Sequence, residues 1–259
     1  MIIREIRCKT ALSASSLPGL TYSLNPYRGC QHKCAYCYVP NVIRVNRNDW
    51  GSFVDVTTNI PKILSTELKN KKTGVVGIST VTDPYQPVEK KYKFTRLCLE
   101  QLLIHDFPIC IQTKSDLIKR DYDIISKFSK AEVMISIATL NDKERKLLEP
   151  NSSSIQSRLD VVRFFSDLGI KTNIFFGPIY PSITKNIVTE IIDVFIEYGA
   201  QEIMMDKLNL KPDILENIEK ISPDLKNLIK NDVSNKELFN EILRVCKKKG
   251  IDATVAFPS

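Results

Sequence analysis

The sequence predicts an α/β fold in which strands and helices alternate around a parallel sheet. Apolar, β-branched runs alternate with amphipathic stretches along most of the chain, and these runs are continuous, as is typical of strands covered on both faces. The length of 259 residues suits one α/β domain. Hydrophobic residues make up 43% of the chain and charged residues 26%, which is enough apolar surface for a sizeable core.

Six apolar runs are the expected strands of this sheet. They cover residues 20–25, 74–80, 107–113, 131–139, 170–176 and 200–208. Between them, apolar residues recur every three to four positions, which predicts helices over 59–70, 88–105, 116–128, 142–149 with 155–168, and 184–198. Helix start signals accompany two of these stretches: Asn59 with Pro61, and Asn141 with Glu144 three residues later.

The pattern changes after residue 210, where helical stretches follow one another. Start signals at "SPDL" (222–225) and "SNKE" (234–237) predict helices, and Gly250 ends the second of them. The apolar piece "IDATVAF" (251–257) is suited to one more strand. We therefore expect a core domain over 1–210 and a helical C-terminal extension over 211–259 that packs on the core.

The seven cysteines and the N-terminal segment predict a cytoplasmic protein. The segment "MIIREIRCKT" is broken by charges and lacks the apolar core of a signal peptide, and no apolar run approaches the length needed to cross a membrane. Cytoplasmic thiols stay reduced, and clustered cysteines there bind metal more often than each other. A net charge of +7 suits a nucleic acid or another anionic partner, and equally a solvated lysine-rich surface.

The stretch "NPYRGCQHKCAYCYVP" (25–40) places Cys30, Cys34 and Cys37 in one loop after the first expected strand, with the spacing C-x3-C-x2-C. Structural zinc prefers four closed ligands, commonly in two separated pairs, and His32 lies between two of the cysteines, where closing a tetrahedron would strain the loop. A cubane iron–sulfur cluster held by three thiolates keeps one iron open for chemistry. We therefore expect these three cysteines to bind an iron–sulfur cluster.

The spacing, with Tyr36 just before the last cysteine, resembles the cluster motif of radical S-adenosylmethionine (SAM) enzymes. The words "GISTVTDPYQPVEKKYKFTR", "IQTKSDLIKRD", "SIATL" and "LEP" extend the resemblance to the spore photoproduct lyase-like branch over residues 22–206. The resemblance implies a partial (β/α)6 TIM-type barrel with a 4Fe-4S cluster in the loop after its first strand. It also implies SAM at the open iron, reductive cleavage of SAM to a 5′-deoxyadenosyl radical that abstracts hydrogen from a substrate, and an electron donor such as ferredoxin or flavodoxin.

The resemblance further implies which residues contact SAM. Tyr36 lies beside the adenine, and a serine and a lysine at the ends of strands bind the ribose and carboxylate. The full set of implied SAM contacts is Tyr36, Thr80, Thr82, Asp83, Lys114, Ser136 and Arg158. Other interpretations stay open: Tyr36 packs the loop, Asp83 forms a turn before a proline, and Arg158 makes a surface salt bridge.

The sequence assigns no catalytic residue and no substrate. Spore photoproduct lyase uses a cysteine as hydrogen donor after its second strand, whereas the matching segment 77–86 here contains none. The favoured interpretation is a radical SAM enzyme acting on an unknown substrate, with nucleic acid among the classes considered. A DNA photoproduct-type repair lyase is one alternative, and a non-enzymatic iron–sulfur or zinc binding module is another. Cys98 and Cys110 lie in apolar stretches and are expected to be core residues.

Overall fold

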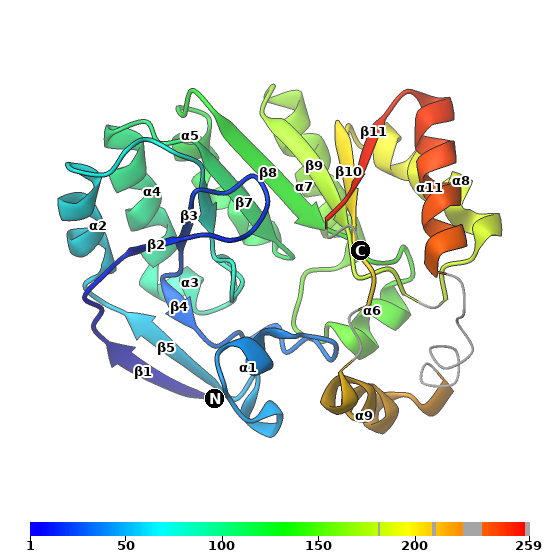
Figure 1. Cartoon of the computed structure of the whole chain (residues 1–259), viewed down its shortest axis with the longest axis horizontal. Helices are drawn as coiled ribbons and strands as arrows, with labels where there is room; N and C mark the ends of the chain where they lie inside the picture. The colour runs from blue at the N-terminus through cyan, green and yellow to red at the C-terminus, as the bar shows by residue number, and fades with distance from the viewer. Residues whose placement is uncertain (181, 209–210, 225–234, 257–259) are drawn as a thin grey trace. The chain divides into compact units, whose positions relative to one another are not determined.

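The computed structural model describes residues 1–180, 182–208, 211–224 and 235–256 (Figure 1). The chain forms two compact units. The first consists of Met1–Lys33 and Val39–Met134, and the second of Cys34–Tyr38 and Ile135–Ser259. The division therefore falls inside the cysteine loop and again inside strand β8 (Ala131–Ser136).

The first unit is built on a mainly parallel sheet. Its strands, in sheet order up to β8, are β2 (Leu12–Ala14), β3 (Tyr22–Leu24), β6 (Val76–Ile78) and β7 (Ile109–Thr113). β2 is antiparallel to β3, while β3, β6 and β7 are parallel to one another, with Tyr22 opposite Val76 and Val76 opposite Ile109. All three residues of β6 are buried, as expected for a strand with covered faces.

A second, smaller sheet in the first unit has the order β1 (Ile2–Ile6), β5 (Phe53–Thr57), β4 (Tyr27–Arg28). The sequence pattern does not predict this sheet, because β1 is exposed along its whole length and β4 has only two residues. Tyr27, Val54, Val56 and Val88 form a buried apolar cluster on it. This sheet is close in sequence to the cysteine loop, since β4 ends two residues before Cys30.

Short helices complete the first unit. They are α1 (Val39–Val42), α2 (Ile60–Leu68), α3 (Glu89–Tyr92), α4 (Phe94–Ile104) and α5 (Tyr122–Ile125), with 3-10 helices at Arg47–Asp49 and Asp116–Asp121. α2 packs against α4 (Figure 1). The single helix predicted over 88–105 is divided at Lys93, which has a left-handed conformation with φ of 57°. The helix predicted over 116–128 is a 3-10 helix followed by the short α5.

The second unit has the strand order β8, β9 (Lys171–Phe176), β10 (Glu202–Met205), β11 (Asp252–Val255), with β9, β10 and β11 parallel. Its helices are α6 (Asp142–Leu148), α7 (Ile155–Asp167), α8 (Lys185–Glu197), α9 (Pro212–Ile221) and α11 (Asn235–Lys249). α7 packs on β9, and α11 packs on both α8 and β11. The Asn141 side chain accepts from the backbone N–H groups of Lys143 and Glu144, so the predicted helix start is confirmed.

The predicted α/β fold class with a parallel sheet of partial TIM-barrel type is confirmed, and the described strands do not close into a complete barrel. All six expected strands are present, and the apolar segment near the C-terminus adds β11. The predicted boundary at residue 210 stays a prediction. Leu225 and Ser234, which belong to the predicted helix starts in the extension, lie outside the described residues. Among the described helices, none has the length and apolar character required to cross a membrane.

Candidate functional site

In the first unit, the beginning of the cysteine loop is held in a tight backbone conformation. Gly29 has φ of +88°, and a Cβ at this position would lie 2.5 Å from the backbone oxygen of Phe53. Only glycine fits both the positive φ and the close approach of the two chains. Cys30 follows directly and is buried, and Lys33, just before Cys34, also has a positive φ of 53°.

The segment after β6 contacts the backbone on either side of Cys30. The Thr82 hydroxyl donates to the Gly29 carbonyl oxygen at 2.6 Å, and Gln86 Nε2 donates to the same oxygen at 3.2 Å. Gln86 Oε1 accepts from the backbone N–H of Gln31 at 2.9 Å. The predicted SAM-binding residue Thr82 therefore uses its proton within the protein, to hold the cysteine loop.

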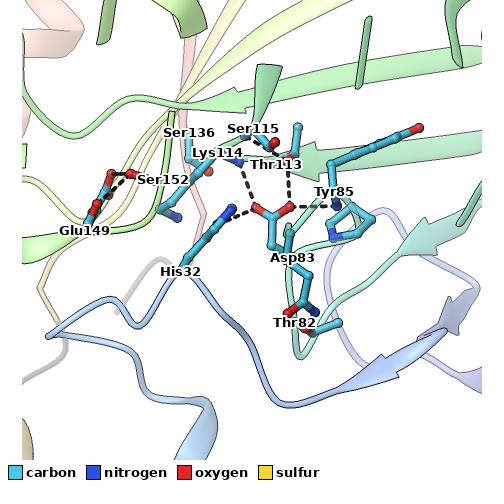
Figure 2. A network of polar contacts seen from close by, with 12 residues as sticks. His32, Thr82, Asp83, Tyr85, Thr113, Lys114, Ser115, Ser136, Glu149 and Ser152 are labelled. Carbon is cyan, nitrogen blue, oxygen red and sulfur yellow. Dashed lines mark hydrogen bonds and ion pairs between the residues drawn. The ribbon is translucent and has the colours of Figure 1, made fainter. Parts of the chain in front are cut away.

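Asp83 is the centre of a buried polar network (Figure 2). Its Oδ1 accepts from the Thr113 hydroxyl at 2.7 Å and from the Tyr85 N–H at 2.9 Å. Its Oδ2 accepts from the Lys114 backbone N–H at 2.8 Å and lies 3.3 Å from Nδ1 of His32. Asp83 thus joins the loop after β6, the end of β7 and the cysteine loop.

The same contacts stabilise the charged form of Asp83. Burial disfavours a carboxylate, but the His32 imidazole, the Thr113 hydroxyl and the Lys114 N–H oppose that effect and lower the pKa of Asp83 to about 2. Two roles were considered for Asp83, contact with SAM and formation of a turn, and its contacts bear on both. The Tyr85 N–H bond is the turn-type contact, and four groups of the protein already surround the carboxylate.

The other predicted residues of the first unit lie at strand ends. Lys114 follows β7 and is half-buried, with its backbone held by Asp83. Thr80 follows β6 and its hydroxyl lies 3.5 Å from Nδ2 of Asn25. Both positions are at the carboxyl ends of parallel strands, where α/β enzymes carry their sites. The structure therefore brings Thr82, Asp83 and the Lys114 backbone together around the loop that carries Cys30.

In the second unit, the segment Cys34–Tyr38 has its own anchors. The Ala35 N–H donates to the Leu148 carbonyl oxygen at 2.8 Å, and the Asn217 side chain donates to the Ala35 carbonyl oxygen at 2.8 Å. The Cys37 N–H donates to the Cys34 carbonyl oxygen at 3.2 Å. Cys34 is buried and Cys37 is half-buried.

Tyr36, Glu149 and Arg158 form a buried network in this unit. The Tyr36 hydroxyl donates to Glu149 Oε1, and Arg158 donates to Glu149 Oε2 and to the Ser152 hydroxyl. Arg158 also donates to the Ser136 carbonyl oxygen at 2.8 Å, at the end of β8. Burial and the Glu149 carboxylate raise the pKa of Tyr36 well above its usual range. The structure thus brings the predicted residues Tyr36, Ser136 and Arg158 together.

Arg158 differs from the alternative that places it in a surface salt bridge, because its side chain is completely buried. Its guanidinium donates to the groups given above and also to the Ser153 carbonyl oxygen. A role in contacting SAM stays a prediction. The ring of Tyr36 lies edge-on to the ring of Tyr180 with centroids 5.8 Å apart, so Tyr36 does pack against a neighbouring ring, as the packing alternative expects.

The donor chemistry of the three cysteines suits an iron–sulfur cluster, since thiolates are its usual protein ligands. In the described part of the chain, no three His, Cys, Asp or Glu side chains are gathered as a metal site. Cys30 belongs to the first unit, whereas Cys34 and Cys37 belong to the second. The ligand set consequently rests on the sequence spacing and stays a prediction.

Two residues of these networks were not among those predicted, Gln86 and Glu149. Both lie in short segments that carry the family resemblance, "DPYQP" and "LEP", but their hydrogen-bond partners are backbone or side-chain groups far away in the sequence. A buried polar side chain requires hydrogen-bond partners, so its presence next to apolar core residues is the signal that could have found them.

Known proteins resemble this chain over most of its length. A family model described as the radical SAM superfamily matches residues 24–195. An uncharacterized protein of Methanocaldococcus jannaschii is 33% identical over 258 residues, which cover 96% of this chain and 95% of that protein. An uncharacterized protein of Acidianus two-tailed virus is 28% identical, covering 88% of this chain and 81% of that protein.

Two solved structures share the fold. Spore photoproduct lyase in complex with a dinucleoside spore photoproduct matches 98% of this chain and 82% of its own, with a TM-score of 0.74 and 16% identity. SuiB of Streptococcus suis bound to the precursor peptide SuiA matches 90% of this chain and 48% of its own, with a TM-score of 0.63 and 18% identity. At these identities the likeness shows the fold alone.

Proposed function

This chain belongs to the radical SAM superfamily, and we propose that it binds a 4Fe-4S cluster through Cys30, Cys34 and Cys37 and cleaves SAM reductively. The observation that carries the proposal is the C-x3-C-x2-C loop, which stands inside the matched region 24–195. When bound, the cluster supplies the electron that cleaves SAM to methionine and a 5′-deoxyadenosyl radical, which abstracts hydrogen from the substrate.

In this proposal, the protein holds the cluster and binds SAM. The three thiolates hold the cluster, and the absence of a fourth cysteine in the loop leaves one iron for SAM. Lys114 offers a cation to the SAM carboxylate, because a lysine ammonium acts as a point charge toward such a group. Thr80 and Ser136, at the ends of β6 and β8, are the proposed hydroxyl contacts.

We propose a mainly structural role for four of the predicted SAM contacts, namely Tyr36, Thr82, Asp83 and Arg158. Each makes hydrogen bonds that hold the protein together, so we assign them first to shaping the site. The ring of Tyr36 can still serve the adenine, because its hydroxyl and not its face is held by Glu149.

The substrate and partners are proposed at a coarser level. A net charge of +7 supports an anionic substrate such as a nucleic acid. Reduction of the cluster requires an external electron donor, and ferredoxin or flavodoxin supplies one in the cytoplasm, the compartment that the cysteine content favours.

Anaerobic reconstitution of the purified protein tests the proposal. We expect about four irons and four sulfides per chain, and formation of 5′-deoxyadenosine when SAM and dithionite are added. Iron and sulfide far below that level, or no 5′-deoxyadenosine, would remove the proposed activity.

The alternatives give different results in simple assays. A non-enzymatic iron–sulfur or zinc binding module would not respond to SAM, so a SAM titration followed by the spectrum of the cluster separates it from the enzyme. A DNA photoproduct-type repair lyase would turn over irradiated oligonucleotides and bind them in a salt-dependent manner, because phosphate contacts release counterions. The absence of a cysteine in 77–86 argues against that specific chemistry.

A further inference from the structure

Gln86 is completely buried between the loop after β6 and the cysteine loop. Both the nitrogen and the oxygen of its side-chain amide form hydrogen bonds. Nε2 donates to the Gly29 carbonyl oxygen at 3.2 Å and to the Thr82 hydroxyl at 2.9 Å, and Oε1 accepts from the Gln31 N–H at 2.9 Å. One side chain thus contacts a carbonyl just before Cys30 and an N–H just after it.

These two contacts fix the conformation of Cys30. The Gly29 carbonyl belongs to the peptide plane that precedes the Cys30 Cα, and the Gln31 N–H belongs to the plane that follows it. A residue has only two soft backbone dihedrals, and they are set once both adjoining peptide planes are held. The direction of the Cys30 Cβ and thiol is then limited to the rotamers of one side-chain dihedral.

We propose that Gln86 is a positioning residue for Cys30, which aims this thiol toward the cluster before the cluster binds. The inference rests on the proposed function, because it assumes that Cys30 is a cluster ligand. Gln86 touches neither the cluster irons nor SAM in this assignment, and it acts through the two peptide groups beside Cys30.

The neighbouring contacts make the arrangement rigid. Thr82 donates to the same Gly29 carbonyl oxygen at 2.6 Å, and the Gln31 side chain accepts in turn from the Val88 N–H. The backbone of Phe53 also lies close to Gly29, since a Cβ at position 29 would be 2.5 Å from the Phe53 backbone oxygen. A side chain at position 86 therefore acts on a loop with little freedom to adjust, and the loss of one end of the amide changes the aim of the thiol.

Chemistry restricts this role to an amide. The site needs a donor toward the Gly29 carbonyl and an acceptor toward the Gln31 N–H at the same time. A glutamine supplies both, a charged glutamate supplies only the acceptor, and a methionine of similar size supplies no donor and only a weak sulfur acceptor. The variant Gln86→Met therefore removes the donor and the strong acceptor, and Gln86→Glu removes the donor when its carboxylate is charged, while both keep a similar side-chain volume.

The test compares wild type, Gln86→Met, Gln86→Glu and the control Thr172→Val. Thr172 is completely buried in β9 and donates to the Ile170 carbonyl oxygen at 2.8 Å, so its replacement also removes a buried hydrogen bond to the backbone. Circular dichroism melting of each protein without cluster measures folding. Iron and sulfide content, competition with a chelator, and the electron paramagnetic resonance spectrum of the reduced cluster with and without SAM measure the site.

We expect Gln86→Met to bind the cluster about 10-fold or more weakly, the size of effect typical of groups that orient metal ligands. Gln86→Glu is expected to retain more cluster but with a shifted resonance spectrum and a weakened response to SAM. Thr172→Val should show wild-type cluster content and spectrum even where its melting temperature falls. If Gln86→Met does not fold, Gln86→Glu alone decides.

Full cluster content and an unchanged spectrum in folded Gln86 variants would overturn the proposal, and so would a cluster loss in Thr172→Val equal to theirs. Failure of the proposed function is recognised separately, because the wild-type protein itself would then take up no cluster.

Discussion

Arg158 and Glu149 form an ion pair in the interior of the second unit, with side-chain exposures of 0% and 1%. Arg158 also donates to the Ser136 and Ser153 carbonyl oxygens, and the other Glu149 oxygen accepts from Tyr36. The pair therefore joins the end of β8 to the second half of the cysteine loop. Because both charges are shielded from water, each depends on the other.

Replacing Arg158 by methionine should lower the free energy of unfolding of the cluster-free protein by about 3–5 kcal/mol, since Glu149 is left as an uncompensated buried charge. Urea denaturation measures the change. Arg163→Met is the matched control, because Arg163 pairs with Glu197 at exposures of 46% and 71%, and such a surface pair is worth about 0–1 kcal/mol. An Arg158 effect seen only when SAM is present would instead favour the predicted SAM contact.

Asp83 should make the stability of the cluster-free protein depend on pH in a defined direction. The pKa of Asp83 in the folded protein is about 2, below the ordinary value of about 3.9, so the folded state favours the carboxylate. Its stabilising contribution is complete above the ordinary pKa and is lost as the pH falls toward 2. Urea denaturation of wild type and Asp83→Asn from pH 7 to pH 3 should show a difference that shrinks with decreasing pH.

The comparison with Asp83→Asn removes the contributions of all other acids, because they are shared by the two proteins. The lowered pKa of Asp83 corresponds to about 2–3 kcal/mol of folding free energy at neutral pH. A difference that stays constant over this range, or that grows as the pH falls, would contradict the assigned direction.

The cysteines separate into two groups that should behave differently on substitution. Alanine at Cys30, Cys34 or Cys37 should abolish retention of a complete cluster after reconstitution, because each removes a thiolate ligand. Cys98→Ala and Cys246→Ala are the controls: both side chains are completely buried in the helices α4 and α11 and pack as small apolar residues. Iron and sulfide analysis should find full content in these two variants, and retention of a full cluster by Cys34→Ala would refute its assignment as a ligand.

The sheet was predictable from the sequence because its strands are short apolar runs rich in β-branched residues, such as "GVVGIST" around β6. The small sheet was not, since the whole of β1 is exposed and its pairing with β5 joins segments about fifty residues apart. The break between α3 and α4 was equally hidden, because Lys93 adopts a left-handed conformation that the sequence pattern does not favour for lysine.

The cysteines of the candidate site were predictable from the sequence, but the residues that hydrogen-bond to the cysteine loop were not. Spacing within one loop identifies Cys30, Cys34 and Cys37, whereas Gln86 acts on backbone groups 55 and 57 residues earlier and Glu149 bonds a tyrosine 113 residues earlier. Such partners follow from the tertiary fold and carry no local pattern. For the same reason, the sequence does not reveal that the hydroxyl of Thr82, a predicted SAM contact, donates to the Gly29 carbonyl oxygen.

Gly29 and Gly169 offer a matched pair for testing how tightly the cysteine loop is packed. Both have a left-handed conformation, with φ of +88° and +71°, so alanine is strained at either position. A Cβ at Gly169 meets nothing within 4 Å, whereas at Gly29 it would lie 2.5 Å from the Phe53 backbone oxygen. We expect Gly169→Ala to cost about 1–2 kcal/mol from backbone strain alone, and Gly29→Ala to cost clearly more.

The two variants should also differ in cluster binding. A displaced Gly29 moves the carbonyl that Thr82 and Gln86 hold, and with it the peptide plane that leads into Cys30. Gly29→Ala should therefore lower the iron and sulfide retained after reconstitution, while Gly169→Ala retains the wild-type amount. Equal destabilisation of the two proteins in urea, together with equal cluster content, would show that the close approach at Phe53 does not constrain the loop.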